Sequence, residues 1–129
     1  EEQKKEKQQP KYQHDVETAV RELKVMEKDG HYFKDKSQDV FKVEDSKIIR
    51  AYSWVYVADL EPGEQTLVKH QWIFNKEVVA TNYLAVPKNK WWVASEKAVT
   101  TDGIGTWKIN VIDINGRVIK SVEFKVEED

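Results

Sequence analysis

The amino-acid sequence predicts an all-β fold, an antiparallel sandwich of about seven to eight strands with a polar N-terminal extension. Two observations carry this prediction. Short runs that alternate apolar and polar residues recur at spacings of about ten residues, and Gly, Pro, Asn and Asp mark turns between them. No stretch between these runs has a reliable helical period.

The run from Ile48 to Val57 is the segment around which the other strands are expected to pack. In an extended chain Ile49 and Val55 point to one face, while Tyr52 and Trp54 point to the other. A helix is the weaker interpretation, because β-branched and aromatic residues dominate. A strand that is apolar on both faces is usually covered on both, so we expect this segment near the middle of a sheet.

The strands after this run form recognisable pairs. Residues 61–64, Glu-Pro-Gly-Glu, predict a type II turn. The strands Thr66 to Phe74 and Glu77 to Val86 follow, and Asn75-Lys76 predicts a tight reversal that joins them as a hairpin. Alternation resumes from Trp91 to Val99.

The last hairpin has the clearest pattern. Trp107 and Val111 belong to one alternating strand and Phe124 to the next, and Asn115-Gly116 between them predicts a two-residue loop. This succession of short strands is typical of sandwiches like those of immunoglobulin and fibronectin type III domains.

The N-terminal part is less decisive. Residues 1–14 read as a polar leader or linker, and residues 15–129 as the sandwich domain. The segment Asp15 to Met26 fits either a strand with an irregularity near Glu22, which we prefer, or a helix. Residues 27–46 predict a long connection with a short strand around Val40, Phe41 and Val43 at its end.

Composition excludes several classes of function. The 129 residues suit one domain, and the net charge of −2 gives no overall attraction to nucleic acid. No run of apolar residues is long enough to span a membrane, and the chain has no cysteine. Because the chain begins at Glu1 rather than Met, we expect a missing upstream segment, through either removal of an export signal, which we prefer, or the choice of chain boundaries.

A family resemblance follows from the order of the strand motifs. They are Tyr52-x-Trp54, His70-x-Trp72, Trp91 to Lys97, Gly105-x-Trp107, Gly116 and Phe124-x-Val126. This order resembles the bacterial domain-of-unknown-function family 2914, over roughly Val16 to Val126. The chain departs from the family's pattern where Trp54 replaces Phe, where Trp92 replaces Arg, and where Phe74 stands a residue later than Tyr.

The resemblance implies a fold and a location but no mechanism. Members look like extracytoplasmic β-sandwich domains, often attached to membrane-anchored or multidomain bacterial proteins, without an assigned activity. We therefore expect a periplasmic, cell-surface or secreted protein.

No pattern in the sequence predicts catalysis. His14, His31 and His70 are far apart and lack zinc-ligand spacing, and Ser95 has no base beside it in its strand. We therefore expect no catalytic residue, metal or cofactor. His70 alternates with core positions, which favours a buried histidine hydrogen-bonded to a backbone or hydroxyl group over a ligand-binding or metal role.

The aromatic residues provide the candidates for binding. Trp72 and Trp107 alternate with aliphatic residues and are expected in the core. Trp91 and Trp92 are adjacent, so one points inward and the other outward; Trp92 is either exposed or packed under the loop at Pro87. The predicted ligand- or partner-binding residues are Trp92, Tyr52 and Tyr83.

These observations lead to a functional hypothesis and one alternative. The preferred function is a non-catalytic exported structural or interaction module that assembles with itself, as a homo-oligomer or filament, through strand pairing of the segment up to about Met26. A monomer whose first strand pairs within its own sheet remains open. The alternative function is a carbohydrate-binding module that uses exposed aromatic residues to hold a polysaccharide.

Overall fold

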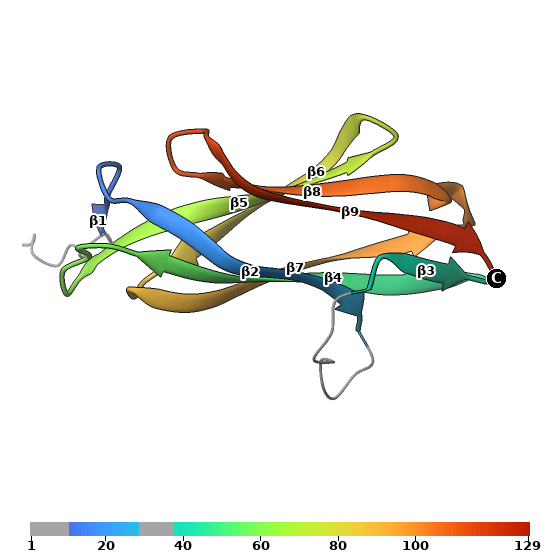
Figure 1. The fold of residues 1–129 in the computed structure, drawn as a ribbon, viewed down its shortest axis with the longest axis horizontal. Coiled ribbons are helices and arrows are strands. Elements are labelled where there is room, and N and C mark those ends of the chain that lie inside the picture. Colours follow the sequence, from blue (N-terminus) through green and yellow to red (C-terminus); the bar gives the residue numbers. More distant parts are fainter. Residues whose placement is uncertain (1–10, 29–37) are drawn as a thin grey trace, which may run out of the picture.

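The computed structural model describes residues 11–28 and 38–129, and these form two packed β-sheets (Figure 1). The smaller sheet has the order β2 (Thr18–Glu27), β4 (Ser46–Val57) and β7 (Lys90–Thr100). The larger sheet has the order β1 (Lys11–Tyr12), β5 (Glu64–Phe74), β8 (Gly105–Asp113), β9 (Val118–Glu128) and β3 (Val40–Val43), with β6 (Glu77–Val86) also paired to β5. A 3-10 turn, η2 (Thr101–Gly103), precedes β8. The predicted all-β sandwich is confirmed.

β4 lies in the middle of its sheet, as predicted, between β2 and β7. Its inward residues, including Ile49 and Val55, are fully buried between the sheets. The expectation that both faces are covered is wrong. Tyr52, Trp54 and Tyr56 on the other face remain partly exposed, because each sheet packs on its partner through one face and no described element covers the second face of β4.

The segment after the leader is a strand, as preferred. β2 runs antiparallel to β4 of the same chain, and its register shifts between Val20 and Glu22, where we predicted an irregularity. In the described residues, therefore, the first long strand pairs within its own sheet. The short β1 lies inside the predicted leader and pairs parallel with the start of β5, and Asn115 donates a hydrogen bond of 2.7 Å to the carbonyl of His14.

The long connection ends in the predicted short strand. β3 pairs parallel with the end of β9, from Val40 to Val43. Residues 1–10 of the leader and residues 29–37 of the connection, with His31, lie outside the described residues.

The first two predicted turns are confirmed. Gly63 has a φ of +85°, and the amide of Glu64 bonds the carbonyl of Glu61 at 3.0 Å, as a type II turn requires. Asn75 and Lys76 both have positive φ, +49° and +75°, which matches the primed turn of a tight hairpin.

The prediction of a two-residue loop at Asn115-Gly116 is wrong. The amide of Gly116 bonds the carbonyl of Asp113 at 3.0 Å, and the amide of Asp113 bonds the carbonyl of Arg117 at 2.8 Å, which makes a three-residue loop. A two-residue type I′ loop needs positive φ at both central positions, and only Gly116, at +90°, has it. The carboxylate of Asp113 stabilises the longer loop by accepting from the amides of Asn115 and Arg117 at 3.0 and 2.9 Å.

Two hydrophobic clusters fill the sandwich. The first contains most of the aromatic core, with Trp72, Trp107 and Phe124 in mutual contact, and the second is built mainly of valines such as Val55 and Val68. Trp107 stacks on Phe124 with ring centroids 5.9 Å apart, and its indole donates to the carbonyl of Gly103 at 2.8 Å. Both predicted core tryptophans are buried, which confirms that prediction.

Replacing Trp107 with alanine should destabilise the fold by roughly 3–5 kcal/mol, because a buried aromatic side chain is removed and leaves a cavity. The midpoint of urea denaturation measures this loss. Tyr83→Ala is the control, since Tyr83 is 68% exposed and the change should stay within about 0.5 kcal/mol. A loss below about 1 kcal/mol for Trp107→Ala would contradict the assignment of this side chain as a core anchor.

Candidate functional site

A layer of hydrogen-bonded polar side chains separates the two hydrophobic clusters. His70 of β5 lies between the sheets, fully buried. Its Nε2 is 2.7 Å from the hydroxyl of Ser53 on β4, and its Nδ1 is 2.7 Å from the hydroxyl of Ser95 on β7. The indole of Trp72 donates to the same Ser95 hydroxyl at 3.1 Å. The predicted core histidine with hydroxyl partners is confirmed.

Burial keeps the His70 ring neutral. Desolvation lowers the pKa of His70 from 6.5 to about 4, because a charged imidazolium is unfavourable away from water. In a neutral ring one nitrogen donates and the other accepts, and a hydroxyl can do either, so both ring nitrogens are satisfied in either tautomer. The layer therefore links the two sheets through hydrogen bonds without a buried charge.

The polar layer places a base next to Ser95, which the sequence did not indicate. The two residues lie on different strands and on different sheets, so no local spacing connects them. A serine beside a histidine is the usual start of a nucleophilic site. Here, however, Ser53 and His70 are fully buried and Ser95 is 8% exposed, so the arrangement stabilises the core rather than presenting a nucleophile to a substrate.

The second feature is the outer side of the smaller sheet, where four aromatic side chains gather. Tyr52, Trp54 and Tyr56 project from alternate positions of β4, and Trp92 lies opposite Trp54 on β7. The ring centroids of Trp54 and Trp92 are 5.0 Å apart at 35°, and those of Tyr52 and Trp92 are 6.5 Å apart at 86°. We call these four residues the aromatic face.

Charged groups border the aromatic face. The guanidinium of Arg50 donates to Glu96 at 2.8 Å and to the hydroxyl of Tyr52 at 2.9 Å. The hydrogen bond from Arg50 is the main cause that lowers the pKa of the Glu96 carboxyl. Arg21, the extra residue of the bulge in β2, places its guanidinium 4.8 Å from the centre of the Tyr56 ring. The face thus combines exposed rings with cations held against them.

The structure brings two of the three predicted binding residues together. Tyr52 and Trp92 are neighbours on the aromatic face, and Trp92 is 40% exposed rather than covered by the loop at Pro87. Tyr83 lies elsewhere, on β6 of the other sheet, with Lys69 over its ring. Trp54 and Tyr56 were not among the predicted binding residues, although their alternation with Tyr52 already places them on the same face.

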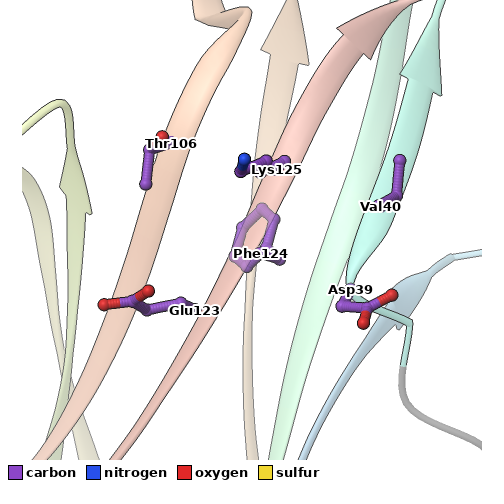
Figure 2. Close-up of a pocket in the computed structure, with 6 residues that line it drawn as sticks. All are labelled: Asp39, Val40, Thr106, Glu123, Phe124 and Lys125. Atoms are coloured by element: carbon purple, nitrogen blue, oxygen red, sulfur yellow. The ribbon is translucent and has the colours of Figure 1, made fainter.

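A shallow hollow of about 350 Å³ occurs on the larger sheet, where β3 begins beside β9. Figure 2 shows Glu123 and Thr106 on one side of it, Lys125 beside them, and Asp39 and Val40 on the other. Among the described residues, no group of three or more His, Cys, Asp or Glu side chains is arranged to hold a metal ion. The hollow is open, and it shows no convergence of groups comparable to the aromatic face.

Residues 65–126 match the family described as "Protein of unknown function (DUF2914)". The resemblance is confirmed. The match covers β5 to β9, a shorter span than the predicted one, and includes His70, Trp72, Ser95 and Trp107. No curated protein matches the chain.

One solved structure confirms the type of sandwich, and others resemble it less closely. An immunoglobulin-like protein from Pseudomonas aeruginosa is similar with a TM-score of 0.54 and 8% identity, covering 86% of this chain and 97% of that one. The CARDB domain of a Pyrococcus furiosus protein, solved in complex with di-metal ions, has a TM-score of 0.49 and 10% identity, covering 88% of this chain and 96% of that one. A β-glucosidase from Listeria innocua scores 0.43 with 10% identity; 88% of this chain matches 16% of that one. The similarity to the Pseudomonas aeruginosa protein confirms the immunoglobulin-like part of the predicted fold.

The polar layer predicts a pH dependence of stability. Because the folded-state pKa of His70 lies near 4 and its ordinary value is 6.5, the unfolded chain binds the proton first as the pH falls. The stability due to the neutral ring is complete above pH 6.5 and is lost toward pH 4, by about 3 kcal/mol. Urea denaturation at a series of pH values measures it, with His70→Leu as the control. If the slope between these pH values is the same in both proteins, His70 does not cause it.

Proposed function

We propose that this chain is a non-catalytic exported interaction module, and that the aromatic face is the surface through which it binds a partner protein. The single observation that carries the proposal is the gathering of Tyr52, Trp54, Tyr56 and Trp92 on a sheet face that no described element covers. Neighbouring aromatic side chains left in partial contact with water are unfavourable by themselves, so their presence favours a binding role.

The chemistry of the face suits a protein partner. Trp, Tyr and Arg are the residues that contribute most to protein interfaces, and all three occur here, with Arg21 and Arg50 against the rings. Arg50 and Glu96, two charged residues that border the face, already form an ion pair. A partner can therefore bury apolar area here without leaving either charge unpaired. A partner with an apolar anchor bordered by polar groups would complement this surface.

A polysaccharide is the second candidate, favoured by the exposed ring of Trp92 with polar groups around it. The ring angles weigh against a flat glycan, since Tyr52 stands at 86° and Trp54 at 35° to Trp92. A row of sugar rings stacks best on coplanar aromatic side chains.

Two parts of the proposal have separate support. The absence of catalysis is supported by the burial of the Ser53, His70 and Ser95 layer, which has no access for a substrate. Export is supported by the resemblance to an extracytoplasmic family. No helix in residues 11–28 and 38–129 is long and apolar enough to cross a membrane.

Photo-crosslinking in the producing cell tests the binding surface. A photoreactive phenylalanine analogue at position 92 should yield a discrete protein adduct, because Trp92 is the most exposed ring of the aromatic face. The same analogue at Val118, an exposed apolar residue on the other sheet, is the matched control. Mass spectrometry identifies the adduct, and cell fractionation shows where it forms.

The outcomes separate the two candidates. If positions 92 and 118 give the same adducts or none, the aromatic face is not a protein-binding surface. If purified protein is instead retarded in gels that contain a polysaccharide, and Trp92→Ala abolishes the retardation, the carbohydrate-binding function replaces the protein-binding one.

A further inference from the structure

We propose that β6 is a self-association edge, which pairs antiparallel with β6 of a second copy of this chain. β6 pairs with β5 on one side, and no described strand pairs with its other side. An open strand presents unpaired backbone N–H and C=O groups, which another strand can satisfy. This inference concerns the larger sheet and is independent of the aromatic face.

β6 differs from the other open edges in its charge. Natural proteins protect sheet edges with charged side chains, bulges or very short strands. β2 has Arg21, Glu22 and Lys24 together with a bulge, and β3 has four residues. β7 has a charged residue at its start, Lys90, and two more, Glu96 and Lys97, in its second half.

In a chain with 34% charged residues, β6 has no charged residue and no proline from Val78 to Val86. Its one protective feature is an irregularity near its start, where the register with β5 shifts between Trp72 and Ile73. From Ala80 to Val86 the pairing with β5 is regular. This uncharged, regular segment is long enough for a second strand to add to it.

Exposed apolar side chains accompany this open backbone. Tyr83 is 68% exposed, Val78 54% and Val79 42%, so the strand presents apolar area as well as hydrogen-bonding groups. Pairing would bury part of this area against the copy. The exposure of Tyr83, which the sequence argument assigned to ligand binding, belongs to this edge.

The occupant that fits best is a second copy, because the edge is complementary to itself. A two-fold axis at Tyr83 would place this residue opposite Tyr83 of the copy and align the uncharged segments of both copies in antiparallel register. Glu77, the single charged residue of β6, would then lie opposite Asn89 of the copy, which stands between Lys88 and Lys90 just beyond the end of the strand. An uncharged centre with opposite charges at the two ends favours this antiparallel pairing over a parallel one.

Cysteine trapping tests the geometry directly, because the chain contains no cysteine of its own. Tyr83→Cys lies near the proposed axis, so two copies should form a disulfide-linked dimer under mild oxidation. Val118→Cys, exposed on β9, is the matched control and should remain a monomer. Equal crosslinking of both variants, or none of Tyr83→Cys at high protein concentration, would overturn the proposal.

Measurement of the molar mass in solution by light scattering is a second test of the proposed dimer. The unaltered chain should show a concentration-dependent dimer, and Ala85→Lys should raise its dissociation constant at least about tenfold, since two like charges are added to the paired edges. Ala85 is exposed in the monomer, so its fold should persist; Val118→Lys is the control. A monomer at all concentrations, or a dimer that Trp92→Ala disrupts and Ala85→Lys does not, would exclude β6 as the interface.

Discussion

The contact of His70 with Ser53 and Ser95 is the interaction on which the sandwich depends. It joins β5 of the larger sheet to β4 and β7 of the smaller one, and it lies between the two hydrophobic clusters. A slip of one residue in any of these strands would turn its polar group outward and leave its partner buried and unsatisfied, which is costly. The layer therefore specifies register as well as adding stability, and it does so with a neutral ring.

The aromatic face follows from the same arrangement. Ile49, Ser53 and Val55 on the inner side of β4 are buried between the sheets. The residues that alternate with them along β4 must therefore point away from the other sheet. No third layer covers them among the described residues, so Tyr52 and Trp54 stay partly exposed and pack on Trp92. The sandwich thus holds aromatic side chains at its surface on a rigid strand, where binding costs little conformational entropy.

The edges of the two sheets differ in how they are protected against strand addition. β2 is protected by charged residues and by its bulge, and it is fully paired with β4 on its inner side. A second copy could therefore pair with β2 along its outer edge alone. β6 lacks the protection of charge from Val78 to Val86, so any strand addition should occur there. The domain then has two separate surfaces, a sheet face and a sheet edge.

The sequence by itself determined the all-β fold, the strands and most of their turns, the burial of His70, Trp72 and Trp107, and the resemblance to a family. These features depend on local alternation and on turn residues, which one chain segment displays alone. Only the tertiary structure decided that Ser53 and Ser95, which lie 17 and 25 residues from His70, bond to its ring, and that no element in the described part of the chain covers the outer face of β4. It also decided the three-residue loop at Asn115. The physical reason is that the alternation of residues along a strand shows which side chains share a face of that strand. Which other strands, or solvent, each face contacts depends on the packing of segments that are distant in the sequence.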